Sequence, residues 1–411
     1  LRFTGFFSGR SNSSKRAGTG KNSADRVAGA GADDFGQGPG ESEVVTADSW
    51  EPSERSVISA SDALLQLSRF DSLIDVRSEA EFALDHLPGA INCPVLTDAE
   101  RVEVGTMDRQ QSSFEARRRG AAYVSRNIAH HVETQFHSKP KTWQPLVYCW
   151  RGGNRSGAMT HILRSVGWQA RQLEGGYRAY RRQVVTDLAA FPARLSLRVV
   201  CGTTGSGKSR LLQQLSAQGA QVLDLESLAH HRGSVLGGLP AQPQPSQKMF
   251  ETHIWSALRS FDPLRVVFVE SESRKIGELR IPDALLTHMR ASECVRLEVP
   301  LQARIRLLRS EYEHFERDRD ALDTQLDCLS ALHGRQKIAQ WKALARDDDW
   351  DSVVEQLLVE HYDPAYLKSI DRNFERAASA DIVRIESDAV DDFKAAARAL
   401  AAQSANLLAR T

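Results

Sequence analysis

The stretch that decides the fold is residues 197–209, which read LRVVCGTTGSGKS. Its apolar first half is typical of a buried strand, and its second half matches the phosphate-loop pattern G-x-x-x-x-G-K-S at every position. A helix is predicted directly afterwards, over residues 210–217. Backbone N–H groups at such a helix start can wrap phosphate oxygens, so the sequence predicts an α/β unit that binds a di- or triphosphate. The candidate phosphate-binding residues are Gly202, Gly205, Ser206, Gly207, Lys208 and Ser209, with Lys208 neutralising the outer oxygens and Ser209 available to a magnesium ion.

A second loop of the strand–loop–helix kind lies earlier in the chain, where residues 146–156 read LVYCWRGGNRS. Here the strand ends in a thiol, Cys149, and the glycine pair allows the backbone to curl so that several N–H groups point at one centre. The following helix start adds positive potential. Such surroundings lower a thiol's pKa and stabilise an anionic adduct on sulfur. We predict Cys149 as the catalytic thiol, with anion stabilisation by Arg151, Gly152, Gly153 and Arg155.

Short apolar runs alternate with helical stretches along most of the chain, which predicts an α/β fold with parallel sheets. We expect a disordered N-terminal segment rich in Gly, Ser, Ala and Asp, then two α/β domains joined by a linker that contains Pro192, and finally a mainly helical region broken at Asp363-Pro364. The predicted ranges are 1–52 for the disordered segment, 53–187 for the thiol-loop domain, 188–195 for the linker, 196–300 for the phosphate-loop domain, and 301–411 for the helical region, which either completes the phosphate-loop domain or stands apart from it.

Composition narrows the possible classes of protein. The 411 residues are 41% hydrophobic and 26% charged with a net charge of zero, which is typical of a globular protein and excludes a polycation that binds nucleic acid through its overall charge. Nucleic-acid binding would need a local basic face, for which residues 117–119 and 178–182 are candidates. The chain has no apolar run of about eighteen residues, so no membrane span is expected. Five dispersed cysteines argue against a disulfide framework and favour a reducing cytoplasm.

Four acidic residues follow predicted strands of the phosphate-loop unit, at the sheet edge where ligands bind in open α/β folds. Asp224 or Glu270 could be the acidic partner of the phosphate loop, although an Asp is more usual at that position than a Glu. Glu226 and Glu272 could act as acid–base groups or bind magnesium, or could equally be structural partners of Arg232 and Arg274. Beyond a magnesium ion at Ser209 no metal site is predicted, because no His/Cys cluster has the spacing of zinc ligands.

The segments before Cys149 resemble the rhodanese signature. Residues 75–82 read DVRSEAEF and residues 86–92 read HLPGAIN. Cys-dependent phosphatases use the same loop geometry, but Tyr148 stands where they usually have a histidine. The resemblance implies a rhodanese-like α/β domain in which Cys149 carries sulfur or selenium, with Asp75 and Arg77 holding the strand end and the loop together.

A rhodanese-like domain followed by a P-loop NTPase-like domain resembles the tRNA 2-selenouridine synthase family. Further segments share the resemblance, which covers roughly residues 55–370; they are RVEVGT at 101–106, LEGGY at 173–177, DLE at 224–226 with HRGS at 231–234, ESESRKIG at 270–277 and YDPAY at 362–366. The resemblance implies replacement of the sulfur of wobble 2-thiouridine in tRNA by selenium from selenophosphate, through an S-geranyl intermediate made from geranyl diphosphate. It also implies a perselenide on Cys149 and a diphosphate on the phosphate loop, where ATP or GTP is the competing ligand.

The expected partners are tRNA with 2-thiouridine at the wobble position and the enzyme that supplies selenophosphate. No tightly bound cofactor is expected, with selenophosphate and geranyl diphosphate as co-substrates and magnesium as a candidate ion. RNA or substrate contacts are expected from Arg77, Arg178, Arg232 and Arg274, or these arginines form ion pairs within the protein. Two alternatives remain: a sulfurtransferase or phosphatase with a regulatory nucleotide-binding domain, and a non-enzymatic RNA-binding protein gated by a nucleotide.

Overall fold

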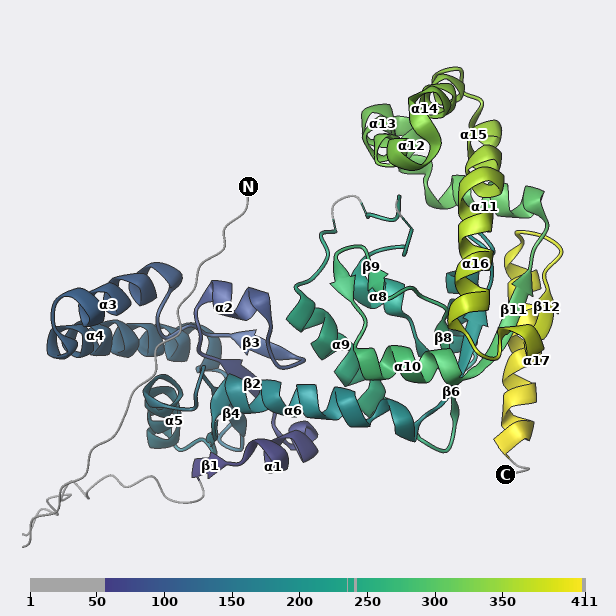
Figure 1. Cartoon of the computed structure of the whole chain (residues 1–411). Helices are drawn as coiled ribbons and strands as arrows, with labels where there is room; N and C mark the ends of the chain where they lie inside the picture. Colours follow the sequence, from purple (N-terminus) through teal and green to yellow (C-terminus); the bar gives the residue numbers. More distant parts are fainter. Residues whose placement is uncertain (1–55, 235, 240–241, 409–411) are drawn as a thin grey trace, which may run out of the picture. The chain divides into compact units, whose positions relative to one another are not determined.

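In the computed structural model, which describes residues 56–234, 236–239 and 242–408, two five-stranded parallel sheets carry the fold (Figure 1). The segment predicted to be disordered, residues 1–52, lies outside the described residues. Parallel pairing throughout both sheets, with helices between successive strands, confirms the predicted α/β fold.

The first sheet has the order β1-β5-β4-β2-β3, and Cys149 follows its central strand, β4. All four residues of β4 are buried, as expected for a strand covered on both faces. The strands are β1 (Val57–Ile58), β2 (Ser72–Asp75), β3 (Ala90–Asn92), β4 (Pro145–Tyr148) and β5 (Arg171–Leu173). The helices are α1 (Ala60–Leu65), α2 (Glu79–Leu84), α3 (Asp98–Gln110), α4 (Ser113–His131), α5 (Asn154–Val166) and α6 (Gly176–Ala190), with a 3₁₀ turn at Leu67–Arg69 and a π turn at Val132–Phe136.

Local sequence signals set several of these boundaries. Ser59 caps α1 by accepting a hydrogen bond from the Asp62 backbone, and Thr97 with Glu100 forms a capping box at the start of α3. Helix α5 ends at Gly167, whose φ of 106° is unfavourable for other residues. These short-range rules place the helix that follows the Cys149 loop.

The second sheet has the order β12-β11-β6-β8-β7, and the phosphate loop follows its central strand, β6. Its strands are β6 (Ser196–Cys201), β7 (Gln221–Leu223), β8 (Val266–Glu270), β11 (Glu293–Glu298) and β12 (Asp381–Arg384), and β9 (Lys275–Ile276) pairs with β10 (Leu279–Arg280) in a separate hairpin. The helices that belong to this sheet are α7 (Lys208–Ala217), α8 (Leu225–Ala229), α9 (Gln247–Ser260), α10 (Asp283–Ala291) and α17 (Val390–Leu408). Because β12 pairs with β11, the C-terminal region completes the phosphate-loop sheet.

A helical region lies between β11 and β12 in the sequence and has a hydrophobic core of its own around Leu326, Trp341 and Val353. It consists of α11 (Leu301–Glu311), α12 (Glu313–Arg317), α13 (Arg319–Asp327), α14 (Ser330–Arg346), α15 (Trp350–Leu357) and α16 (Asp363–Asn373), followed by a 3₁₀ turn at Ala377–Ser379. The predicted break at Asp363-Pro364 is wrong. A π turn, Leu358–Tyr362, joins α15 to α16, and Pro364 lies in the first turn of α16, where its missing N–H costs no hydrogen bond.

The stretch predicted as a linker, residues 188–195, is largely helical. Helix α6 continues to Ala190 and a 3₁₀ turn follows at Pro192–Arg194. Leu188 and Leu195 are buried in a core that also contains residues from both sheets. Across the boundary Tyr180 donates to Thr252 at 3.1 Å, and Trp255 donates to Asp187 at 2.8 Å. The two sheets therefore belong to one packed unit rather than to domains on a tether.

Candidate functional site

The Cys149 side chain lies inside the ring of backbone N–H groups that the sequence predicted. It is 3% exposed, and the Ser156 hydroxyl donates to its sulfur at 3.2 Å. Burial alone would raise the pKa of this thiol. Hydrogen bonds from the Ser156 hydroxyl and from the backbone at Ser156, Arg151 and Gly153 outweigh burial and lower it. The loop therefore favours a thiolate or another anion centred on this sulfur.

The curl of the loop depends on two glycines and one glutamine. Gly152 has a φ of +66°, and a Cβ added there would lie 2.5 Å from the Leu173 carbonyl oxygen. An added Cβ on Gly176 would collide with the Cys149 carbonyl oxygen. The Gln172 side chain donates to the Gly152 carbonyl at 2.7 Å. These contacts fix the shape of the loop from the neighbouring strand, β5, and from the start of α6.

Arginines around this loop have different roles. Arg155 is ion-paired with Glu81 of α2 at 3.1 Å and is 22% exposed, so its charge is partly neutralised before any ligand binds. Arg151 is exposed at the mouth of the loop. Arg77 was predicted either as an RNA or substrate contact or as a partner of Asp75 at the strand end. It is only 1% exposed, which excludes the first role and favours the second. It is ion-paired with Asp75 at 2.6 Å and lies over the ring of Tyr177. These contacts connect the end of β2 to the neighbouring loops.

The phosphate loop has the conformation that its sequence predicted. Gly205 and Gly207 have φ values of 75° and 74°, which few other residues tolerate. The Lys208 ammonium group donates to the Gly202 carbonyl oxygen at 2.8 Å, so the lysine folds back over the loop. The buried Ser206 hydroxyl has no hydrogen-bond partner in the described part of the chain.

Two side chains that the sequence analysis did not single out hold this loop from outside. Arg304 of α11 donates to the Thr204 carbonyl at 2.8 and 2.9 Å and is ion-paired with Asp363. The Tyr366 hydroxyl of α16 accepts a hydrogen bond from the Gly202 backbone at 2.6 Å. The helical region therefore supports the phosphate loop through these two side chains. Tyr366 lies in the quoted segment YDPAY, but only the fold shows what it contacts.

The predicted acidic residues gather beside Lys208 and Ser209. Ser209 donates to Glu226 at 2.9 Å, and the Glu226 backbone donates to Glu270 at 2.8 Å. Asp224 instead caps α8, since its side chain accepts a hydrogen bond from the Ser227 backbone. The suggested pairing of Glu272 with Arg274 is wrong, because Arg274 is ion-paired with Asp283 at 3.1 Å.

Burial and mutual repulsion raise the pKa values of these carboxyls. Burial is the largest cause at each of the four, and neighbouring carboxylates add to it at Glu226, Glu270 and Glu272. The pKa of Glu272 is raised to about 8. One oxygen of Glu270 is buried without a hydrogen-bond partner in the described residues. A cation beside Ser209 would relieve the repulsion, so the donor set suits a magnesium ion that also contacts a bound phosphate. Within the described ranges, no group of three or more His, Cys, Asp or Glu could hold a metal ion by itself.

A cavity of about 760 Å³ lies over the phosphate loop. Its walls include the loop, the acidic residues, Arg232 and the side of α16, and no residue before Thr204 is among the described residues that line it. The Cys149 loop is therefore a separate site. Arg232 lies over the ring of Tyr312, 4.8 Å from its centroid, and its Nη1 is buried without a hydrogen-bond partner in the described part of the chain.

Two family models match segments of the chain. The rhodanese-like domain model matches residues 59–183, and the model described as the tRNA 2-selenouridine synthase AAA domain matches residues 195–326. A tRNA 2-selenouridine synthase of Alcanivorax borkumensis is 32% identical over 327 residues, covering 72% of this chain and 88% of that protein. The chain belongs to the tRNA 2-selenouridine synthase family. A relative of the same name from Nitrosomonas europaea is 38% identical over 58% of this chain, and one from Nitrosomonas eutropha is 36% identical over 61% of it. The matches span 63% and 66% of those two proteins, slightly under two thirds of their length.

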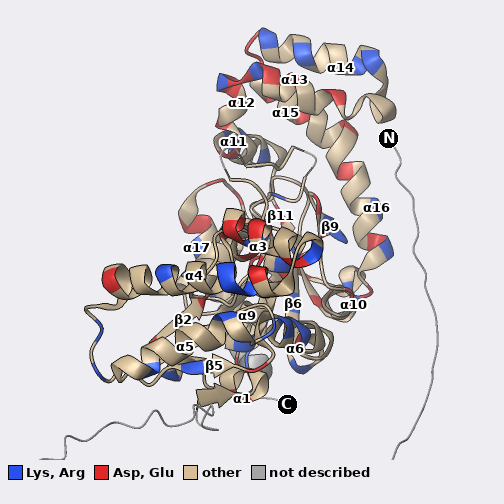
Figure 2. Ribbon diagram, turned by 90° about the vertical axis from the view of Figure 1, so that its left-hand side faces the viewer, with Lys and Arg blue, Asp and Glu red and all other residues tan. Residues whose placement is uncertain are grey.

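Family membership confirms the resemblance inferred from the two loops and accounts for their order. Several arginines that the sequence offered as a basic face for tRNA form ion pairs within the protein. Arg178 is exposed on α6, but Arg181 is ion-paired with Glu251 and Arg119 with Glu103. Figure 2 shows acidic and basic positions interspersed along α3 and α4.

In the described residues no helix is long and apolar enough to cross a membrane.

Proposed function

We propose that this chain is a tRNA-modifying transferase that converts wobble 2-thiouridine to 2-selenouridine, with selenophosphate as the selenium source and an S-geranyl intermediate made from geranyl diphosphate. The observation that carries the proposal is the presence of two separate anion sites in one member of this family. One site centres on a thiol with a lowered pKa, and the other is a complete phosphate loop in a large cavity.

The first step assigned to the phosphate loop is transfer of the geranyl group. The sulfur of 2-thiouridine attacks the first carbon of geranyl diphosphate, a carbon–sulfur bond forms, and the carbon–oxygen bond breaks as pyrophosphate leaves with the electron pair and the nucleoside loses a proton. Lys208 and the N–H groups of the loop would stabilise the departing pyrophosphate. The unpartnered Nη1 of Arg232 in the same cavity supports a further contact to this anion.

A magnesium ion fits the proposed site. Ser209 and Glu226, with Glu270 behind them, would hold it, and the ion would neutralise charge on the diphosphate. The chain's own contribution is to position these oxygens and to place Lys208 beside them.

The second step replaces sulfur by selenium. Overall, a carbon–selenium bond forms at C2 of the base, the carbon–sulfur bond breaks, geranyl thiol leaves, and water takes up the phosphate of selenophosphate. Selenium stays at the selenide level throughout, so no sulfur–selenium bond forms at Cys149. The Cys149 loop is assigned as the selenium carrier, because the N–H groups that favour the thiolate would equally hold the selenophosphate anion and the selenide released from it. The Cys149 thiol, with its lowered pKa, would give its proton to the leaving geranyl thiolate. Since the two sites have separate linings, the wobble nucleoside would have to visit them in turn.

The test is mass analysis of nucleosides from 2-thiouridine-containing tRNA incubated with geranyl diphosphate, selenophosphate or both. We expect Cys149→Ala to accumulate the geranylated nucleoside and Lys208→Ala to form neither product. The controls are Cys328→Ala and Lys394→Ala, which change exposed residues that do not line the phosphate cavity and should behave as the wild type. Unchanged 2-thiouridine in every reaction of the wild-type protein would overturn the proposal.

A further inference from the structure

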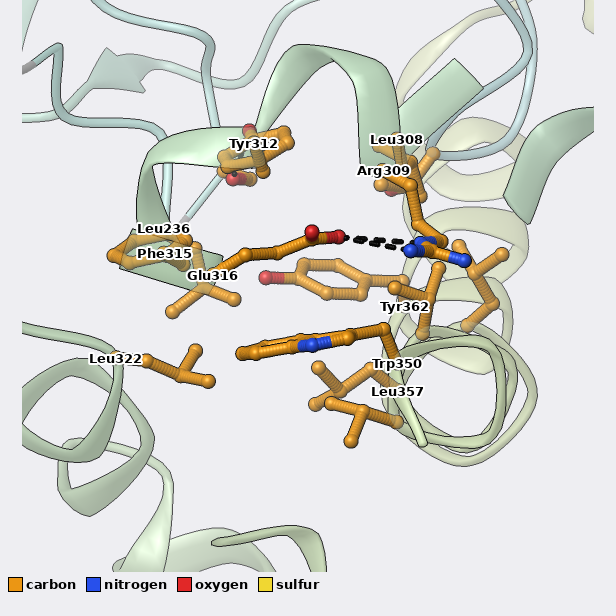
Figure 3. A pocket seen from close by; sticks show the side chains of 15 residues that line it. Leu236, Leu308, Arg309, Tyr312, Phe315, Glu316, Leu322, Trp350, Leu357 and Tyr362 are labelled. Carbon is orange, nitrogen blue, oxygen red and sulfur yellow. Dashed lines mark hydrogen bonds and ion pairs between the residues drawn. The ribbon is translucent and has the colours of Figure 1, made fainter. Parts of the chain in front are cut away.

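A second, smaller cavity adjoins the phosphate cavity and lies within the helical region. Its volume is about 70 Å³. Figure 3 shows Tyr312 and Leu308 on one side of it and Leu322, Trp350 and Leu357 on the other. The remaining lining residues are Thr204, Ser234, Leu236, Arg309, Phe315, Glu316, Val353, Val354, Leu358 and Tyr362.

The two cavities are neighbours through shared wall residues. Thr204, Ser234, Leu308, Tyr312 and Tyr362 line both. The phosphate loop itself packs against this wall, since a Cβ added to Gly205 would lie 2.8 Å from Leu308. A ligand whose phosphates lie on the loop can therefore extend past Tyr312 into the smaller cavity.

The chemistry of the smaller cavity suits a hydrocarbon. Its lining is almost wholly aliphatic and aromatic. The one ion pair in its wall, between Arg309 and Glu316, is already satisfied at 3.1 Å, and Arg309 also contacts Asp351. Ser234 and Tyr312 hydrogen-bond to each other at 3.2 Å. The buried Tyr362 hydroxyl has no hydrogen-bond partner among the described residues, but one hydroxyl cannot pair with all the ring nitrogens of a purine base, and unpaired polar groups are costly to bury. An alkyl chain has no such requirement.

We propose that this cavity holds the hydrocarbon chain of a prenyl diphosphate and limits its length, with Leu322 and Val353 as specificity-determining residues. The inference rests on the proposed function, because it places the diphosphate of the same ligand on the phosphate loop. The cavity has room for about five water molecules, which suits the last carbons of a short branched chain whose first carbons lie beside the wall residues that the two cavities share. A longer chain would have to displace the buried wall formed by α13 and α15.

The first experiment is calorimetric titration of the full chain with magnesium pyrophosphate, geranyl diphosphate, farnesyl diphosphate and ATP. We expect geranyl diphosphate to bind at least about tenfold more tightly than pyrophosphate, because even two buried methylene groups give such a factor. Equal affinities for the two ligands would overturn the inference while leaving the diphosphate site intact. Binding of ATP alone would overturn the proposed function and the inference together.

Variants test the position of the hydrocarbon chain. Val353→Phe should fill the cavity and reduce the preference for geranyl diphosphate over pyrophosphate to within about threefold, with pyrophosphate affinity unchanged. Leu322→Ala should enlarge it and raise farnesyl diphosphate affinity relative to geranyl diphosphate by about tenfold. The matched control is Leu326→Ala, one turn further along α13, which is buried in the same core but does not line the cavity. If Leu326→Ala shifts chain-length preference as much as Leu322→Ala does, the effect is loss of packing and the inference fails.

Discussion

At the scale of single residues, the chemistry of Cys149 depends on hydrogen bonds that outweigh its burial. Cys93 is the informative contrast, since it lies at the end of β3 without such a ring and burial raises its pKa to about 12. Both thiols are buried, so burial does not distinguish them. The difference comes from the N–H groups and the Ser156 hydroxyl that face one sulfur and not the other.

The Ser156 contribution can be measured. In Ser156→Ala the thiolate of Cys149 loses a hydrogen bond, so its pKa should rise and its rate of alkylation by iodoacetamide near neutral pH should fall by about tenfold. The rate is followed by mass spectrometry of the Cys149 peptide across a pH series. Ser165→Ala on the same helix, whose hydroxyl donates to the His161 carbonyl, is the control. An unchanged pH midpoint in Ser156→Ala would show that the backbone alone sets this pKa.

Glu272 gives a second prediction at this scale. Its folded-state pKa, about 8, exceeds its ordinary value of 4.5 because of burial and then repulsion from Glu226. The folded protein thus binds a proton that the unfolded chain has released, and stability falls as pH rises through this window. Glu272→Gln removes that loss and should raise the free energy of unfolding by up to about 5 kcal/mol near pH 9, with little change near pH 5. Urea unfolding at the two pH values measures this change in stability. Glu278→Gln, at an exposed position, is the control. A Glu272→Gln protein that is less stable than the wild type at high pH would contradict the prediction.

At the scale of elements, helix α17 supports the phosphate loop from behind. A Cβ added to Gly207 would lie 2.5 Å from the ring of Phe393, which is 1% exposed. Phe393→Ala should therefore cost about 3–5 kcal/mol of stability and weaken pyrophosphate binding, because the loop loses the surface on which it rests. Thermal unfolding and calorimetric titration measure the two effects. Val390→Ala, at an exposed position of the same helix, should alter neither. Unchanged pyrophosphate affinity in a destabilised Phe393→Ala would show that the loop holds its own shape.

The elements also show what the sequence could and could not predict. Both loops, their flanking strands and most of the other sheet strands were predictable, because short apolar runs and glycine patterns are local signals. The two-residue strand β1 was not predicted. The effect of Pro364 was not, since a π turn before it lets the chain stay helical. Arg304 and Tyr366 were missed as supports of the phosphate loop because they contact it across 100 and 164 residues of sequence. The sequence left both a substrate contact and an ion pair with Asp75 open for Arg77, because its sequence position reveals its charge but not its burial.

At the scale of the whole molecule, residues from both sheets share one core, and α6 is the element that joins them. Tyr180 of α6 packs edge-on against Trp255 of α9, with ring centroids 5.5 Å apart, and Trp255 is 1% exposed. A shared core of this kind makes the two sheets unfold together, because neither can expose its side of the contact without cost. The sequence suggests two domains that fold independently of each other, whereas the packing predicts that the two sheets unfold together.

Native-state hydrogen exchange tests this coupling. In the wild type, amides of β4 and β6 should exchange with the same free energy of opening. Trp255→Ala removes the contact at a cost of about 3–5 kcal/mol, and the two strands should then open with different free energies. Trp341→Ala is the matched control, since it truncates an equally buried tryptophan in the separate core of the helical region and should leave β4 and β6 equal. Different opening free energies for β4 and β6 already in the wild type would mean that the sheets fold independently and that α6 is a tether after all.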